Sequence, residues 1–84
     1  MRHFASTKFW DRYEALPADI RDLADKNFLL LKSDLRHPSL HFKKLGNHWS
    51  ARVGAHYRAL AVEVDGGMTW FWIGTHAEYD RIAN

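Results

Sequence analysis

The spacing of apolar residues divides the chain into a helical first part and a strand-rich second part. A short apolar segment at 3–5 could be a first strand, and Ser6 is a favourable N-cap for the helical spacing that follows. Pro17 ends this first helix and can occupy the first turn of a second, which we expect to end near Ser33. The two segments predict an antiparallel helical hairpin with one apolar side.

Beyond Pro38 the pattern changes to short apolar stretches separated by turn residues. Asp65-Gly66-Gly67 is typical of a hairpin turn, because glycine permits positive φ, and the segment after it is rich in the aromatic residues that favour strands. Residues 76–82 could form a short terminal helix. The strand candidates are 40–45, 49–53, 57–64 and 68–73.

This order predicts an α+β fold in which a short N-terminal strand and a helical hairpin pack on one face of a three- or four-stranded antiparallel sheet. A single domain spanning 1–84 is expected, since two independent cores are not plausible at this size. In the last strand Phe71 and Ile73 should point to one face of the sheet. Trp70 and Trp72 should point to the other face, which then either meets the C-terminal segment or binds a partner.

Composition is typical of a folded chain without cofactors. Hydrophobic residues make up 46% of the sequence, which can supply a core and argues against intrinsic disorder. The absence of cysteine excludes thiolate zinc sites, and Pro38 between His37 and His41 argues against a helical metal-binding pair, so we expect no metal or other cofactor. Neither a signal-peptide core nor an apolar run of membrane length is visible, and the cytoplasm is therefore the expected location.

Charge is unevenly distributed along the chain, although its net value is only +2. Residues 1–34 carry equal numbers of acidic and basic side chains, whereas the segment from Leu35 to Val62 has no acidic residue. An acid-free basic segment indicates binding to a polyanion or to an acidic partner segment, although a solvated face with chance asymmetry would look the same. The basic residues of this segment are Arg36, Lys43, Lys44, Arg52 and Arg58, together with His37, His41, His48 and His56.

Two arginines are candidates for phosphate binding. Arg52 and Arg58 flank a bend at Gly54-Ala55 and should lie on neighbouring strands. Arginine carries a permanently charged fork suited to phosphate oxygens, so the pair could clamp one phosphodiester. The alternative is an ordinary surface ion pair between Arg58 and a nearby acid. The candidate acids are Glu63, Glu78 and Asp80.

His76 and Tyr79 add a second kind of chemistry. They are three residues apart just after a strand end, so on a helical turn they share one face. Histidine can exchange a proton near neutral pH, and tyrosine can stack on a base or offer a phenolic proton. With Arg58 they could cleave RNA without a metal, because RNA carries its own nucleophile, the 2′-hydroxyl. Alternatively, His76 caps the strand end and Tyr79 packs against a neighbouring tryptophan.

An ordered set of short motifs resembles the RelE/ParE superfamily of type II toxins. The segment 49–60 resembles the arginine–glycine–tyrosine–arginine hairpin of these toxins, and Lys43-Lys44-Leu45-Gly46 is similar to the entry to it. The segment 72–80 resembles the closing strand of a histidine-bearing subgroup, and the Leu16-Pro17 junction is also similar. The resemblance covers nearly the whole chain and implies a compact microbial ribonuclease fold in a toxin–antitoxin module.

The resemblance also implies roles for individual residues. RelE-like members cut messenger RNA in the ribosomal A site, and their phosphate-stabilising arginine matches Arg58. A second basic residue matches His76 and a downstream tyrosine matches Tyr79, whereas two lysines of RelE itself fall near His48 and Ser50. We therefore expect the catalytic residues to be Arg58, His76 and Tyr79, with His76 as general acid or base.

The leading hypothesis is the toxin of a type II toxin–antitoxin system, acting as a metal-independent, ribosome-dependent mRNA endoribonuclease. The alternatives are a ParE-like inhibitor of DNA gyrase, in which His76 is a structural residue, or a non-catalytic partner-binding homologue. Either kind of toxin implies a cognate antitoxin, expected to be an acidic, partly disordered peptide lying across an apolar groove near the helices or the last strand. The expected substrate-binding residues are Arg52, Lys43, Lys44 and His56.

Overall fold

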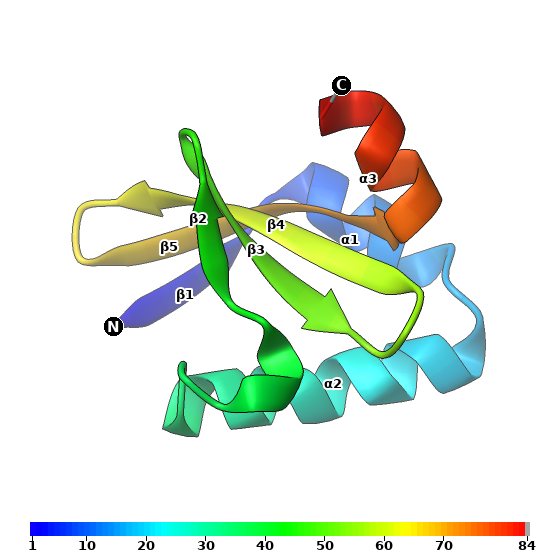
Figure 1. Ribbon diagram of the computed structural model, residues 1–84, viewed down its shortest axis with the longest axis horizontal. Coiled ribbons are helices and arrows are strands. Elements are labelled where there is room, and N and C mark those ends of the chain that lie inside the picture. The colour runs from blue at the N-terminus through cyan, green and yellow to red at the C-terminus, as the bar shows by residue number, and fades with distance from the viewer. Residues whose placement is uncertain (84) are drawn as a thin grey trace.

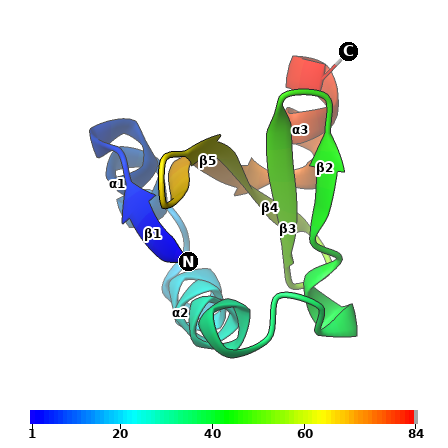
Figure 2. The same cartoon turned by 90° about the vertical axis from the view of Figure 1, so that its left-hand side faces the viewer.

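A curved five-stranded sheet forms the centre of the molecule, with strand order β1-β5-β4-β3-β2 (Figure 1). The computed structural model describes residues 1–83. Helix α1 packs on β5 and α2 on β3, and α3, which follows β5, lies across the sheet from α2 (Figure 2). The elements are β1 (Arg2–Ala5), α1 (Thr7–Glu14), α2 (Ala18–Ser33), the 3-10 helix η1 (Pro38–Leu40), β2 (Lys43–Leu45), β3 (His48–Val53), β4 (Tyr57–Val64), β5 (Gly67–Thr75) and α3 (His76–Ala83).

The structure confirms the α+β class and the two N-terminal helices, α1 and α2, expected from local signals. Ser6 caps α1, and its Oγ accepts a hydrogen bond from the Phe9 N–H at 3.2 Å. Pro17 directly precedes α2, where its fixed φ suits the start of a helix, and α2 ends at Ser33 as expected. The two helices pack mainly on different strands, which leaves room between them for a groove.

The sheet has more strands than expected because the N-terminal strand joins it. β1 pairs in parallel with β5, with Arg2 opposite Gly67 and Ala5 opposite Trp70. Gly67 permits this close approach, since a Cβ at that position would lie 2.0 Å from the Arg2 carbonyl oxygen. The pairing joins the N-terminal strand to the last strand of the sequence. Local turn signals and periodicity cannot predict such a long-range pairing.

A β-bulge corrects the predicted side-chain directions in β5. Pairing with β4 skips Phe71, which lies between two paired residues, Trp70 and Trp72. This extra residue brings Trp70 and Ile73 to the same helix-covered face, where both line one pocket, whereas simple alternation placed them on opposite faces.

The core lies between the sheet and the helices α1 and α2, and α3 covers part of the second face of the sheet. Tyr79 of α3 is only 7% exposed, and its ring centroid lies 6.4 Å from that of Trp72. The second face therefore meets the C-terminal segment. Within residues 1–83, no helix has both the length and the hydrophobicity needed to cross a membrane. The buried apolar residues of the core are Leu16, Leu31, Leu40, Ala51, Val53, Ala59, Ala61, Met68, Trp70 and Ile73.

Candidate functional site

Arg58 is at the centre of a group of polar side chains on the face that α3 partly covers. Strand β4 places it opposite Arg52 on β3 and opposite Gly74 on β5. Its Nε donates a hydrogen bond to His76 Nδ1 at 2.9 Å, and its NH1 group donates to Ser50 Oγ at 2.8 Å. Strand β3 and helix α3 therefore hold the guanidinium in a defined orientation.

The positive charge of Arg58 has no carboxylate partner among residues 1–83. Each of the three acids that could have neutralised it is paired elsewhere. Glu63 pairs with Lys44 and Glu78 with Arg12, and Asp80 Oδ1 lies 3.4 Å from His76 Nε2. The ion-pair alternative for Arg58 therefore does not hold in this structure, and the charge is available to an incoming anion.

His76 is the first residue of α3, and one of its ring nitrogens faces Arg58. Its backbone N–H donates to the His56 carbonyl oxygen at 2.7 Å, which ties α3 to the turn between β3 and β4. Because Nδ1 accepts a hydrogen bond from Arg58, the neutral ring carries its hydrogen on Nε2, which lies 3.4 Å from Asp80 Oδ1. The ring is thus placed between a cation and an anion, and it is oriented for proton transfer.

A capping box holds the start of α3. Thr75 Oγ1 accepts a hydrogen bond from the Glu78 N–H at 3.1 Å, and Glu78 Oε1 accepts from the Thr75 N–H and hydroxyl at 3.0 Å each. The Thr75 N–H, followed by the Arg12 guanidinium and the Thr75 hydroxyl, holds the pKa of Glu78 below its usual value. The threonine-x-x-glutamate spacing of Thr75 and Glu78 is visible in the sequence and is a capping-box pattern that indicates a helix start at this point.

The lowered pKa of Glu78 predicts that acid weakens the attachment of α3. A carboxyl group whose pKa falls on folding stabilises the protein above its unfolded pKa of about 4.5, and the contribution is lost as pH falls through the folded value. We expect Glu78→Gln to lower the free energy of unfolding by about 0.5–1 kcal/mol at neutral pH, and by less in acid. Urea unfolding of both proteins across this pH range measures the difference. Equal free energies at neutral pH would contradict the prediction.

Tyr79 lies at the site, but its ring is not open to a base. Its centroid lies 6.3 Å from the centroid of the His48 ring, and the ring belongs to the packed face that also contains Trp72. The Arg58 guanidinium carbon lies 5.6 Å from the Tyr79 ring centroid. In this conformation the ring packs under Arg58 and against a tryptophan, which agrees with the packing alternative. Stacking on a base would require the ring to leave its position.

The two predicted substrate-binding lysines lie on opposite faces of the sheet. Lys43 pairs with Ser50 across β2 and β3, so it shares the face of Arg58. Lys44 points to the other face, where its Nζ lies 3.8 Å from Glu63 Oε1. Neighbouring residues of a strand alternate in direction, so of the two lysines only Lys43 shares the face of Arg58.

Arg52 and His56 lie near Arg58 without being held against it. Arg52 Nε donates to the Gly54 carbonyl oxygen at 2.8 Å, and its NH1 lies 3.4 Å from His41 Nε2. Its guanidinium is therefore directed toward the bend that follows β3. His56 is exposed in that bend. The two arginines present separate positive charges on neighbouring strands, and a phosphate clamp would require Arg52 to turn away from the bend.

Ser50 and His48 lie on the same face of the sheet as Arg58. In the sequence they were noted only because two lysines of RelE fall near these positions. Ser50 is 0% exposed, and its hydroxyl accepts the hydrogen bond from Arg58. The Nε2 atom of His48 is buried without a hydrogen-bond partner in the described structure. Only the strand register brings these side chains to Arg58, so no local spacing could have found them.

The histidines at 37 and 41 have structural contacts. His37 Nδ1 accepts a hydrogen bond from the Ser39 N–H at 3.3 Å and caps the 3-10 helix η1. His41 has a left-handed backbone with φ of 43° and faces Arg52. Among residues 1–83, no three potential metal ligands come together.

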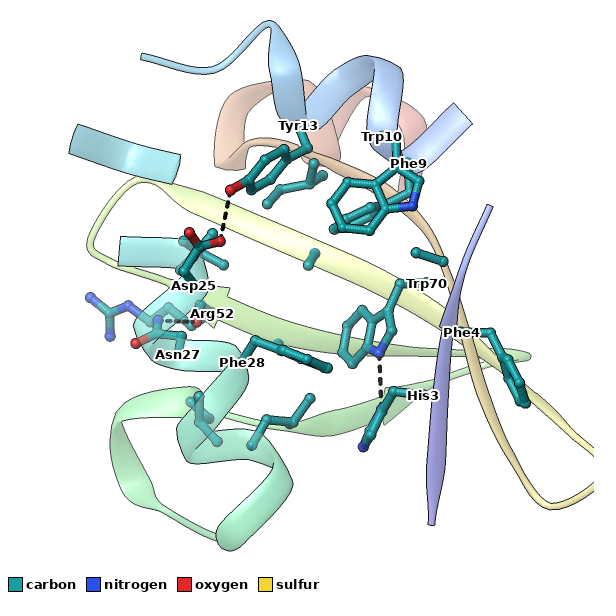
Figure 3. Close-up of a pocket in the computed structure, with 18 residues that line it drawn as sticks. His3, Phe4, Phe9, Trp10, Tyr13, Asp25, Asn27, Phe28, Arg52 and Trp70 are labelled. Atoms are coloured by element: carbon teal, nitrogen blue, oxygen red, sulfur yellow. Dashed lines mark hydrogen bonds between the residues drawn. The ribbon is translucent and has the colours of Figure 1, made fainter. Parts of the chain in front are cut away.

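A concave surface lies on the opposite face, between α1, α2 and the sheet (Figure 3). This surface, which we call the helix groove, has a volume of 320 Å³ and is lined mainly by apolar side chains. A hydrogen bond of 2.7 Å from the Tyr13 hydroxyl to Asp25 Oδ1 links the two helices, and Trp70 Nε1 donates to His3 Nδ1 at 3.1 Å (Figure 3). The exposed aromatic side chains that face the groove are Trp10 and Phe28, whereas the Phe4 ring points away from it on the far side of β1 (Figure 3).

The helix groove changes the pKa of two of its side chains. The hydrogen bond to Asp25 raises the pKa of Tyr13. Burial, with smaller effects from the N-terminus and Lys32, lowers the pKa of His3. A lowered pKa favours the neutral ring that the hydrogen bond from Trp70 requires, so His3 itself adds no charge to the groove.

The fold has counterparts among solved structures, although no protein-family model and no curated protein matches the sequence. One is the RelB-RelE antitoxin-toxin complex from Methanococcus jannaschii, with a TM-score of 0.73 and 18% identity over 93% of this chain and 96% of that chain. Another is the YoeB/ParE toxin from Agrobacterium tumefaciens, with a TM-score of 0.70 and 18% identity over 90% and 99%. The chain has the RelE/ParE toxin fold.

The RelE/ParE fold spans almost the whole of both chains, which confirms the predicted architecture. At 18% identity the likeness concerns the fold, and it does not distinguish a histidine-bearing subgroup. The roles of Arg58, His76 and their neighbours therefore rest on the contacts made in this chain.

Proposed function

We propose that this protein is the toxin of a type II toxin–antitoxin system and that it cuts messenger RNA on the ribosome. One observation carries the proposal: Arg58 has no carboxylate partner within residues 1–83 and donates a hydrogen bond to His76. A permanently charged donor beside a proton-transfer group is what RNA cleavage through the 2′-hydroxyl needs. The acid-free segment 35–62, which contains Arg58, adds attraction for the ribosomal polyanion.

The chemistry follows from these two side chains. The 2′-oxygen attacks the adjacent phosphorus and the bond to the 5′-oxygen breaks, which leaves a 2′,3′-cyclic phosphate and a 5′-hydroxyl. Arg58 stabilises the extra negative charge on the phosphorane. A phosphate that draws the guanidinium away from His76 frees the unprotonated Nδ1, which takes the proton of the 2′-hydroxyl as that oxygen attacks. The imidazolium so formed, or a water molecule, then gives a proton to the leaving 5′-oxygen. Lys43, on the same face, orients the RNA backbone.

The test is cleavage of a defined message on purified ribosomes. The purified protein should cut messenger RNA bound in the ribosome and leave the free message largely intact. If ribosome-bound RNA stays whole while the protein inhibits DNA supercoiling by gyrase, the alternative ParE-like activity replaces the proposal. If the protein does neither and its expression leaves growth unchanged, it is a non-catalytic homologue.

We further propose that the antitoxin binds in the helix groove. Trp10 is 50% exposed and Phe28 is 39% exposed there, which is unusual for large aromatic side chains unless a partner covers them. Lys32 lies over the Phe28 ring at 5.1 Å, so a cation lies beside the apolar surface. A peptide with apolar and acidic side chains fits this combination.

Replacing Trp10 by alanine should weaken antitoxin binding by about 30-fold, because a large aromatic side chain in an apolar groove is typical of a binding hot spot worth about 2 kcal/mol. The control is Leu29→Ala, which removes a side chain that is 62% exposed and does not line the groove. Titration calorimetry with the product of the neighbouring reading frame measures both. Unchanged affinity in Trp10→Ala would place the antitoxin elsewhere.

A further inference from the structure

We propose that Arg12, on α1, is a positioning residue for the Arg58–His76 pair and acts through helix α3. The inference rests on the proposed function, because it assigns a determinant of the same site. Arg12 contacts neither Arg58 nor His76 in any hydrogen bond or ion pair of the described structure. Its effect must therefore pass through the residues that hold α3.

The guanidinium of Arg12 joins three elements. Its Nε donates a hydrogen bond to the Ile73 carbonyl oxygen on β5 at 2.7 Å. Its NH2 group donates to Glu78 Oε2 on α3 at 3.0 Å. The guanidinium carbon also lies 4.9 Å from the Trp72 ring centroid, within the range of a cation–π contact. A single side chain thus fixes α1, the end of β5 and the start of α3 relative to one another.

The Ile73 carbonyl is available because β1 is short. Pairing between β1 and β5 ends where Ala5 lies opposite Trp70, so the rest of β5 forms an open sheet edge. A backbone acceptor at an edge needs a donor from outside the sheet. Arg12 supplies that donor from the helix that follows β1, and it anchors β5 immediately before the site.

Glu78 carries the connection from Arg12 to the catalytic histidine. One oxygen of its carboxylate accepts from Arg12, and the other accepts from the N–H and hydroxyl of Thr75. Thr75 is followed directly by His76, whose ring must stay at 2.9 Å from Arg58 Nε. A shift of the Glu78 carboxylate therefore moves the first turn of α3 and the ring with it.

Gly74 leaves the space that Arg12 occupies. A Cβ at position 74 would lie 2.8 Å from Arg12 NH2 and 2.7 Å from the Trp72 ring. Gly74→Ala therefore displaces the guanidinium and the Trp72 ring by steric contact, and it leaves the charge of Arg12 unchanged. This gives a second way to disturb the same connection, independent of a substitution at Arg12.

The experiment compares full-length Arg12→Gln, Arg12→Lys and Gly74→Ala with the wild type in the ribosome cleavage assay. The matched control is Arg21→Gln, since Arg21 also donates to backbone carbonyls, those of Glu14 and Leu16, but among residues 1–83 it makes no hydrogen bond or ion pair with α3. We expect kcat to fall about 10- to 100-fold in the three test variants with KM nearly unchanged, because misplacing a catalytic group by about 1 Å costs up to 100-fold. Arg12→Lys should not rescue, because an ammonium cannot reproduce the arginine fork.

A spectroscopic readout separates this inference from the nuclease proposal. In the wild type, nitrogen NMR of the His76 ring should show an acceptor Nδ1 and a protonated Nε2, and in Arg12→Gln this pattern should be lost. If the wild type cuts no RNA, the proposed function fails, but a changed His76 signal in Arg12→Gln still supports positioning. Unchanged ring signals and unchanged kcat in Arg12→Gln would overturn the inference. An equal loss of kcat in Arg21→Gln would overturn it too, because the effect would then be one of general stability.

Discussion

Replacing Arg58 by alanine is expected to reduce cleavage of ribosome-bound messenger RNA by about 100- to 1,000-fold, the typical cost of losing one preorganised donor to a developing negative charge. The guanidinium is held by Ser50 and His76, and no carboxylate of residues 1–83 neutralises it. Its charge is thus already oriented before substrate arrives. The fall should appear mainly in kcat, because the interaction is strongest with the phosphorane.

Two further variants sharpen the Arg58 measurement. Arg58→Lys keeps the charge but presents a single point donor, so it should recover only part of the lost rate. Arg36→Ala removes one positive charge at an exposed position of the acid-free segment and should have a much smaller effect.

Because Arg58→Ala leaves the buried Ser50 hydroxyl without its donor, a loss of about 1 kcal/mol in stability is expected, and thermal unfolding must show that the variant is folded. Wild-type cleavage by folded Arg58→Ala would exclude a role in charge stabilisation.

Replacing His76 by alanine is expected to reduce cleavage by about 100- to 10,000-fold, the range for removing a general acid or base. His76 is placed by three contacts: its backbone N–H donates to the His56 carbonyl, its ring Nδ1 accepts from Arg58, and its ring Nε2 lies near Asp80. Only the ring contacts are lost in the variant. The first turn of α3 should persist, since the capping box between Thr75 and Glu78 does not use this side chain.

His76→Gln is the control that separates proton transfer from structure. A glutamine side chain can still accept a hydrogen bond from Arg58 but cannot exchange a proton at neutral pH. Both variants should therefore be slow, and both should retain the stability of the wild type to within about 1 kcal/mol. If cells expressing His76→Ala suffer full toxicity, His76 is structural and the gyrase alternative gains support.

The sequence predicts most of the fold because its signals are local. Ser6 and Pro17 mark helix boundaries through the geometry of one turn, and Gly66 marks a hairpin through its positive φ of 78°. The parallel pairing of β1 with β5 depends on contacts between the two ends of the chain. The bulge at Phe71 depends on the register of two strands, and no residue pattern within one strand specifies it.

Local signals also indicated part of the candidate site. Arg58 and His76 could be selected by residue type and by their positions at a strand and a strand end, and the structure brings them into contact. The environment of these residues was beyond local inference. Ser50 reaches Arg58 through the register of β3 with β4. Arg12 reaches the support of the site through helix packing, 61 residues before Ile73 in the sequence.

The central claim is tested most directly by mapping the ends of RNA produced by the purified protein on programmed ribosomes, with wild type and His76→Ala side by side. The account predicts wild-type cuts within the ribosome-bound message, each leaving a 2′,3′-cyclic phosphate and a 5′-hydroxyl, and a loss of these ends in His76→Ala. Intact message with the wild type, or the same ends at the same rate with His76→Ala, would contradict it.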